Sequence, residues 1–513
     1  MESLLTNLGI GFGAVFALDP VKLFGYAISM PVNLVFAFIG VVIGTLIGVL
    51  PGIGPLATIA MLLPVTFTLK PLAGLIMLAG IYYGAMYGGS TTSILVNLPG
   101  EVASVVTCLD GYQMARRGRA GVALTTSALG SFVGGCFGTL LLAAFAVPLA
   151  EMALEFYPPE YFSLMVLGLI GAVVLASGSL IKALAMICLG LLLGMVGTDV
   201  NTGVARYSMS IPQLVDGIGL VSMAMGVFGF SEVISNLEQR EKREVFTKKV
   251  SSLFPTKEDF KRMSMPILRG SIMGSIFGFL PGGGAPLASF ASYALEKKVS
   301  SHRAEFGKGA IEGVAGPETA NNAAAQTAFI PLLTLGIPPN AVMAIMVGAM
   351  MIHNIQPGPQ VMTANPTLFW GLIVSMWVGN LMLIILNLPL IGVWVSLLKV
   401  PYRFLYPAIL TFCCIGAFTV NNDTVDVLTA AIFGFIGYVF LKFGCEGAPL
   451  LLGFVLGPMM EEYFRRSLLL SRGDFSVFFT RPVSLSLLLI SAVLLVIVAV
   501  PAIKAKREET FRE

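Results

Sequence analysis

The chain has 513 residues, of which 56% are hydrophobic and 12% are charged, and its mean hydropathy is +0.88. Soluble globular domains carry about 25% charged residues, so this composition excludes an ordinary soluble protein and predicts a polytopic membrane protein. The formal net charge is only +3, and no basic stripe is interleaved with aromatic residues, so we expect no nucleic-acid partner.

Apolar segments of about 20 residues, the length that crosses roughly 30 Å of hydrocarbon, recur along the whole chain. The N-terminus carries Glu2 instead of a basic stretch, and we expect it to be retained rather than removed as a signal peptide. An all-α fold of roughly 10–12 spans is predicted. Besides an N-terminal span and two broken segments, the predicted spans cover residues 72–98, 121–149, 160–178, 180–197, 213–237, 309–336, 366–388, 404–422, 425–442 and 482–503.

Two apolar segments, 230 positions apart, break on the same glycine–proline pattern. GTLIGVLPGIGP begins at Gly44, and GSIFGFLPGGGAP begins at Gly274, which indicates an internal duplication. Proline lacks an amide donor and glycine loosens the backbone, so each break frees polar backbone groups that only protein or a water-filled cavity can satisfy. A pair of such breaks is a sequence indication of a transporter's binding site.

Charge predicts how the two broken segments enter the membrane. Lys and Arg are frequent in 238–269 and again in 296–308, so both flanks of the second break are expected in the cytoplasm. A segment that enters and leaves on one side is re-entrant, which predicts a helical hairpin over 266–296. The first copy, 31–68, has sparse charge around it and is expected to enter from the opposite face. The segment 101–119, which ends in ARRGR, is expected to be a cytoplasmic loop.

These expectations define a domain organisation of inverted repeats. The first repeat is 1–237, the cytoplasmic linker is 238–265, the second repeat is 266–470, and a terminal span with a basic tail is 471–513. Opposed duplicated units of this kind are the architecture of many secondary transporters.

A polar segment follows each predicted hairpin, within 72–98 and within 309–336. Gly88, Gly89, Gly316 and Pro317 predict unwinding within these two segments. Hydroxyls, amides and freed carbonyls are oxygen ligands for a small cation, while amide NH₂ groups and helix N-termini suit a carboxylate. The alternative is that these small residues only allow close helix packing.

Seven motifs together resemble the large membrane subunit of the tripartite tricarboxylate transporters, the TctA family. They cover the chain from about residue 40 to about residue 470, and they are GTLIGVLPGIGPLATIAMLLP, LAGIYYGAMYGGSTTSILVNLPGE, TCLDGYQMARRGRAG, GFLPGGGAP, GPETANNAAAQTAFIPLLTLGIP, IQPGP and GAPLLLGFVLGPMMEEYFRRSL.

The resemblance implies a multi-pass symporter of the bacterial inner (plasma) membrane that imports citrate or another organic carboxylate. The implied coupling ion is sodium, with the proton as the alternative, and no organic cofactor is expected. The implied partners are a periplasmic solute-binding protein and a small second membrane subunit. The chain also looks like a distant relative of elevator-type carboxylate transporters, in which a hairpin-bearing domain slides against a scaffold. Carried onto this chain, the resemblance implies unwound segments at 88–93 and 318–322.

The hairpin tips and the polar segments supply the candidate site. The candidate substrate-binding residues are Pro51, Gly52, Gly54, Ser90, Thr91, Thr92, Ser93, Pro281, Gly282, Gly283, Gly284, Thr319, Asn321 and Asn322. The candidate sodium ligands are Gly52, Thr92, Asn97, Gly282, Glu318 and Asn322.

Two other classes of function stay open at this point. An anion channel is one, because hairpins also build selectivity filters, although opposed duplicated units favour a carrier. An intramembrane enzyme is the other, and it requires an activated nucleophile, paired aspartates or a metal-ligand set. The sequence has neither HExxH nor GxGD, so we predict no enzymatic activity and no catalytic residues.

Overall fold

The computed structural model describes residues 2–23, 26–50, 54–175, 179–199, 202–238, 254–280, 282, 284–397 and 402–500. Strands within these residues form only two antiparallel pairs, β1 (Asp19–Leu23) with β2 (Tyr26–Met30) and β3 (Gly197–Thr198) with β4 (Ala205–Arg206). Six helices of the described residues are long and apolar enough to cross a membrane, and seven shorter apolar helices accompany them. The prediction of an all-α, multi-pass membrane protein is confirmed, while the number of spans stays a prediction.

The helices of the first half precede a stretch, 239–253, that lies outside the described residues. They are α1 (Glu2–Phe16), α2 (Val32–Val49), α3 (Pro55–Thr66), α4 (Pro71–Val96), η1 (Val102–Ser104), α5 (Val105–Met114), η2 (Ala115–Arg119), α6 (Ala120–Leu154), α7 (Pro158–Leu175), α8 (Leu180–Gly194), η3 (Pro212–Leu214), α9 (Leu220–Ala224), η4 (Met225–Phe230) and α10 (Ser231–Glu238).

The helices of the second half follow this stretch. They are α11 (Lys257–Phe279), α12 (Gly284–Val299), η5 (Arg303–Glu305), α13 (Glu312–Thr327), α14 (Phe329–Leu335), α15 (Ala341–Ile352), α16 (Gln360–Ala364), α17 (Pro366–Asn387), α18 (Ile391–Leu397), α19 (Tyr402–Asn421), α20 (Thr424–Lys442), α21 (Gly447–Leu470), α22 (Val477–Thr480) and α23 (Pro482–Ala499).

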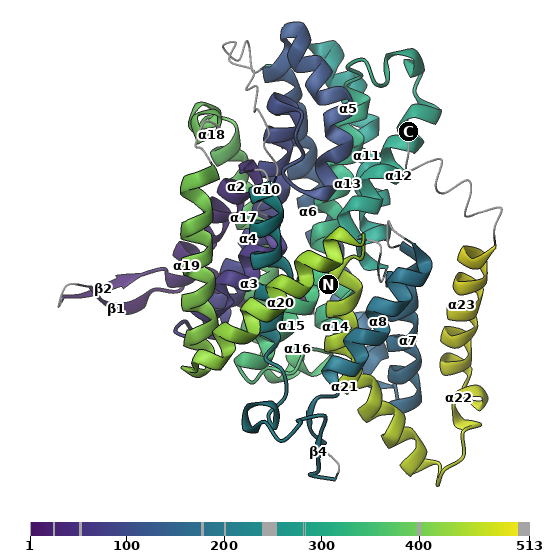
Figure 1. Cartoon of the computed structure of the whole chain (residues 1–513). Coiled ribbons are helices and arrows are strands. Elements are labelled where there is room, and N and C mark those ends of the chain that lie inside the picture. Colours follow the sequence, from purple (N-terminus) through teal and green to yellow (C-terminus); the bar gives the residue numbers. More distant parts are fainter. Residues whose placement is uncertain are drawn as a thin grey trace.

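The helices form a bundle that encloses α4 and α13. Every residue of α13 is buried, and so is nearly all of α4. In Figure 1, α11, α12 and α13 gather at one end of the bundle, and α14, α15 and α16 lie toward the other end. The β1–β2 ribbon projects from one side, and α23 lies at the outer edge, where it packs on α7.

Glycine spacing explains why α2 packs so closely on α4. Every fourth residue on one face of α2 is a glycine that lies against a carbonyl of α4, and a Cβ there would lie within 2.3–2.5 Å of the carbonyl oxygen. Such an approach leaves no room for a side chain, so the two backbones are in direct contact. The glycine–carbonyl pairs are Gly40 with Met77, Gly44 with Ile81, and Gly48 with Ala85.

The second half repeats this packing between α11 and α13. Cβ atoms built on its glycines would lie within 2.2–2.4 Å of the partner carbonyl oxygens. The glycines follow those of α2 by 230 positions, and the carbonyls follow those of α4 by 239. The pairs are Gly270 with Gly316, Gly274 with Ala320, and Gly278 with Ala324.

The predicted unwinding of the polar segments is wrong. Helix α4 continues through 88–93 and α13 through 318–322. Hydroxyls within them bond back to their own helix, as when Ser93 donates to the carbonyl of Gly89 at 3.0 Å. Glycine serves packing here instead: a Cβ on Gly88 would lie 2.3 Å from the Thr45 carbonyl oxygen.

A helix interruption does occur after the second polar cluster. Helix α13 ends at Thr327, and α14 begins at Phe329. Pro331 has no N–H to donate to the carbonyl of Thr327, and its ring crowds that carbonyl, so the helix is broken one turn before the proline.

Two boundaries also differ from the sequence-based expectations. The segment 101–119, expected as a loop, is helical from Val102 through η1 and α5, and η2 follows with a kink at Gly118, whose φ is +81°. Helix α11 begins at Lys257, inside the predicted linker 238–265. A capping box explains the early start, because Thr256 Oγ1 accepts from the Asp259 N–H while the Asp259 carboxylate accepts from the Thr256 N–H.

Candidate functional site

Each glycine–proline break lies between two helices, as the sequence predicts. At the first, α2 gives way to extended backbone at Leu50, and α3 starts after Gly54. At the second, α11 gives way to extended backbone at Leu280, and α12 starts at Gly284. The candidate residues Pro51, Gly52, Pro281 and Gly283 lie outside the described residues.

Gly282 is the described part of the second tip, and its surroundings require glycine. Its φ is +80°, and its N–H donates to the Pro339 carbonyl at 2.7 Å. A Cβ there would lie 2.3 Å from the carbonyl oxygen of Gly171 on α7. The tip therefore fits between α7 and the connection from α14 to α15.

The connection that follows each polar segment has the same local form in both halves. Asn97 ends α4, and Gly336 ends α14, 239 positions later, both in the left-handed conformation. Glu101 then caps η1 with φ −150° and ψ 167°, and Asn340 caps α15 with φ −151° and ψ 172°. Asn97 itself is exposed, so it does not join the other candidate sodium ligands.

Glu318 is the centre of the polar contacts. Its side chain is 1% exposed, and its Oε2 accepts from Ser90 Oγ of α4 at 2.5 Å. Its Oε1 accepts a short hydrogen bond from Thr107 Oγ1 of α5. The structure thus brings together two candidates that the sequence placed in separate segments, and it adds Thr107.

Glu101 is a second acid at this site, one that the sequence analysis placed in a loop. Its Oε2 accepts from the Ala103 N–H at 2.7 Å, and its Oε1 accepts from Asn321 Nδ2 at 3.2 Å. A Cβ built on Gly89 would lie 2.9 Å from the Glu101 Cγ. Since Ser90 contacts Glu318, the two carboxylates border the same turn of α4.

The other candidates divide into cross-linking and packing residues. Thr92 Oγ1 donates to the Val49 carbonyl at 2.7 Å and so ties α4 to the end of α2. Asn322 Nδ2 donates to Ser131 Oγ of α6 at 2.7 Å. Thr319 Oγ1 donates to the Ala315 carbonyl of its own helix at 2.7 Å, and Thr91 is buried in α4, so helix packing describes these two.

Several buried amide atoms of α13 have no hydrogen-bond partner within the described chain. They are the Oδ1 atoms of Asn321 and Asn322 and both amide atoms of Gln326, and all three side chains are 0% exposed. Buried amides normally form hydrogen bonds, so these atoms indicate where an ion, a water or a substrate would bind. Sequence reasoning included Gln326 in the polar segment but not among the candidate ligands.

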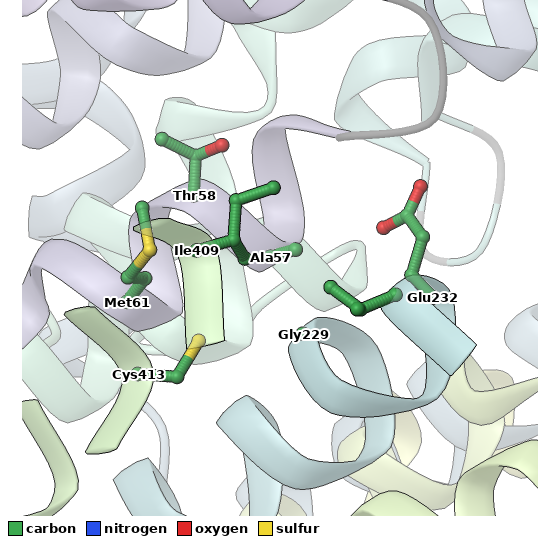
Figure 2. A pocket seen from close by; sticks show the side chains of 8 residues that line it. Ala57, Thr58, Met61, Gly229, Glu232, Ile409 and Cys413 are labelled. Carbon is green, nitrogen blue, oxygen red and sulfur yellow. The ribbon is translucent and has the colours of Figure 1, made fainter. Parts of the chain in front are cut away.

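A narrow pocket lies beside the first break, and Figure 2 shows it from close by. Glu232 of α10 is one of its lining residues, and its carboxylate is hydrogen-bonded to the backbone of Gly54 at the start of α3. This acid also escaped sequence reasoning, because it follows the apolar run of its span. The remaining lining residues are Ala57, Thr58, Met61, Gly229, Val233, Ile409 and Cys413.

Two buried acids form hydrogen bonds with α11 and α12. Arg269 of α11 and Glu296 of α12 form a bidentate ion pair at 2.6–2.7 Å, although Glu296 is 0% exposed. Asp110 of α5 accepts from the N–H groups of Gly309 and Ala310 at 2.7 and 2.9 Å, before α13. Among the described residues, no group of three or more His, Cys, Asp or Glu side chains could hold a metal ion.

Two enclosed helices, two glycine-lined breaks and a buried polar centre define a multi-pass membrane protein built around an internal polar site. The chain belongs to the tripartite tricarboxylate transporter TctA family, whose model matches residues 34–452. The expected family membership is thereby confirmed, and the family is one component of a tripartite transport system.

Two relatives from Agrobacterium vitis are similar to this chain. One, described as an uncharacterized 52.8 kDa protein in the TAR-I ttuC' 3'region, is 56% identical over 513 residues and is covered completely, as is this chain. The other, described as an uncharacterized protein in the TAR-II ttuC' 3'region, is 58% identical over 240 residues, which are 47% of this chain and 99% of the relative. No solved structure matches the chain.

Proposed function

We propose that this protein is a secondary symporter that imports a tricarboxylate or a related organic carboxylate across the bacterial inner membrane. Sodium is the proposed coupling ion, with the proton as the alternative. The family membership supports the transport class. The observation that carries the proposal is the Ser90–Glu318 hydrogen bond, because it puts a buried acid and the hydroxyl-rich turn of α4 in one site between the two halves.

The inverted-repeat organisation is part of this proposal. It is supported by the two glycine–carbonyl series with their constant offsets, and by the matching backbone angles of Glu101 and Asn340. The divisions at 1–237, 238–265, 266–470 and 471–513 are proposed on the same ground, with α11 extending into the linker. In this arrangement each glycine-lined break is the tip of a re-entrant hairpin, one from each face of the membrane.

The tips and the polar centre have separate proposed roles. Backbone N–H groups at the start of α3 and α12 point out of helix N-termini, which favour a carboxylate. The hydroxyls and amides of α4 and α13 would hold the cation and orient the substrate. Transport by movement of a hairpin-bearing domain against a scaffold is the proposed form of alternating access.

The proposed partners are a periplasmic solute-binding protein, which delivers the carboxylate, and a small second membrane subunit. The family is part of a tripartite system, and this supports both partners. A membrane subunit working alone would then show little uptake, so the functional test must include all three proteins.

The test is uptake of radiolabelled citrate and other organic acids into proteoliposomes that contain both membrane subunits, with the binding protein added outside. An inward sodium gradient should drive accumulation, and dissipating it should abolish accumulation. Liposomes without this chain are the control. Equal uptake with and without sodium and proton gradients would exclude symport, and single-channel currents would instead indicate a channel.

A further inference from the structure

We propose that Glu101, Glu318 and Asn321 form the binding site of the sodium ion that drives transport. The inference rests on the proposed symport and deepens it by giving the coupling ion a place. Glu101 and Asn321 are not part of the sodium site that the sequence predicts, and the structure brings all three residues together from the cap of η1 and from α13.

The two carboxylates are close neighbours. Asn321 follows Glu318 by three residues on α13, so both side chains lie on one face of that helix. Asn321 Nδ2 donates to Glu101 Oε1, while Gly89 and Ser90 of α4 contact Glu101 and Glu318 respectively. The carboxyl groups of Glu101 and Glu318 are therefore close enough for the charge of one to act on the other.

No cation of the described chain neutralises this pair. The ion pairs among the described residues include neither Glu101 nor Glu318. Arg269, on the neighbouring α11, is held by a bidentate pair with Glu296. Two buried carboxylates without a positive partner are costly, so the site favours an added cation.

An unused oxygen lies beside both acids. Asn321 is 0% exposed, its NH₂ group is bound to Glu101, and its Oδ1 has no hydrogen-bond partner in the described chain. An amide oxygen next to two carboxylates is a ligand set for a hard cation. A proton shared between the acids would leave this oxygen unused.

The surroundings favour sodium over a divalent ion. Calcium takes six to eight oxygen ligands, and magnesium keeps several of its waters, whereas this site is enclosed by packed helices. The donors around the acids also favour ionised carboxylates: Ser90 and Thr107 donate to Glu318, and the Ala103 N–H donates to Glu101.

The site explains why cation and substrate would bind together. A substrate carboxylate that approaches α13 meets two negative charges while the site is empty. Bound sodium cancels part of this charge and draws η1 toward α13, so substrate affinity rises with sodium and sodium affinity rises with substrate by the same factor.

The test is the melting temperature of the purified full chain against NaCl, with choline chloride keeping ionic strength constant. We expect saturable stabilisation by NaCl and none by KCl. Glu318→Gln and Glu101→Gln should each raise the half-saturating NaCl concentration at least tenfold. Glu151→Gln, at an exposed position of α6, is the matched control and should keep the wild-type value.

The outcomes distinguish the sodium site from the transporter proposal. Wild-type half-saturation in both folded Gln variants would overturn the site, and so would stabilisation by CaCl₂ or by protonation alone. If one variant does not fold, the other decides. If organic acids stabilise the protein equally with and without sodium, the sodium site is excluded and the transporter proposal stands. If sodium binds but the three-protein assay shows no carboxylate uptake, the transporter proposal fails and the sodium site stands.

Discussion

Ser90 of α4 donates a 2.5 Å hydrogen bond to Oε2 of Glu318 of α13, which joins two fully buried residues 228 positions apart. The donor and the acid come from the two segments that follow the glycine–proline breaks. The bond therefore connects the two halves of the chain at the site proposed for the coupling ion.

Removing this donor should destabilise the protein. A hydrogen bond to a charged group contributes about 1.5–3 kcal/mol, so Ser90→Ala should lower stability by an amount in that range. Thermal melting in detergent measures the effect. Ser486→Ala removes an exposed hydroxyl that bonds only within α23, and it serves as the control. A Ser90→Ala protein that melts like the wild type would show that this bond contributes nothing.

Replacing a packed glycine by alanine should destabilise the protein to a similar extent in either half. Gly44→Ala and Gly274→Ala each place a methyl group within 2.5 Å of a carbonyl oxygen, so each should cost about 1–3 kcal/mol or more through backbone displacement. Gly13→Ala in α1 has no atom within 4 Å and should gain up to about 1 kcal/mol from helix propensity. Melting temperatures of the three variants test these effects. A higher melting temperature for Gly44→Ala or Gly274→Ala than for the wild type would contradict the prediction.

The break between α11 and α12 should not tolerate a side chain at Gly282. Gly282→Ala adds a Cβ 2.3 Å from the Gly171 carbonyl oxygen, so we expect carboxylate uptake to be lost while membrane insertion persists. Gly203→Ala is the control. Gly203 also has a positive φ, +70°, but a Cβ there would have no atom within 4 Å, so this variant introduces backbone strain without a steric clash. Uptake that survives Gly282→Ala would reduce the tip to a tolerant turn.

Asp110 should contribute more to the stability of the protein than Tyr293, whose hydroxyl it binds. Asp110→Asn weakens two backbone hydrogen bonds to the segment before α13, and we expect a loss of about 2–3 kcal/mol. Tyr293→Phe removes only the 2.9 Å bond from its hydroxyl and should cost about 1.5 kcal/mol, the low end of the range for a bond to a charged group, because Tyr293 is only partly buried. Melting temperatures of both variants give the order, and the reverse order would contradict the assignment of Asp110 as the anchor.

The ion pair near η5 should make stability depend on pH in a defined direction. The Arg262 guanidinium lowers the pKa of Glu305 below its usual value of 4.5. A lowered native pKa means that the contribution is complete above about pH 4.5 and is lost as pH falls through the native pKa. The Glu305 side chain is 44% exposed, so the contribution should stay under about 1 kcal/mol.

The difference in melting temperature between wild type and Glu305→Gln measures this contribution. It should be present near pH 7, shrink below about pH 4.5, and weaken with added salt. A difference that grows toward acid pH would mean that the carboxyl group is stabilised in its protonated form instead.

Much of the fold follows from local pattern. The predicted spans 72–98, 121–149 and 366–388 correspond to α4, α6 and α17, because long apolar runs in a membrane protein have no stable alternative to a helix. Helix α15 escaped prediction, since its 12 residues are too few to cross a membrane. The unwinding at 88–93 was wrong because glycine permits close packing as well as bending, and sequence alone does not distinguish the two uses.

The sequence by itself determined the membrane class, the two glycine–proline breaks and Ser90, Glu318 and Asn322 as candidate site residues. Composition and spacing suffice for these, since they are properties of short segments. Only the tertiary structure decided that Glu101 belongs to the same site, through its hydrogen bond to Asn321, 220 positions away. Contacts between residues so far apart in the sequence depend on how the helices pack. Helix packing is determined by the fit between the surfaces of different helices, which the pattern within one segment does not reveal.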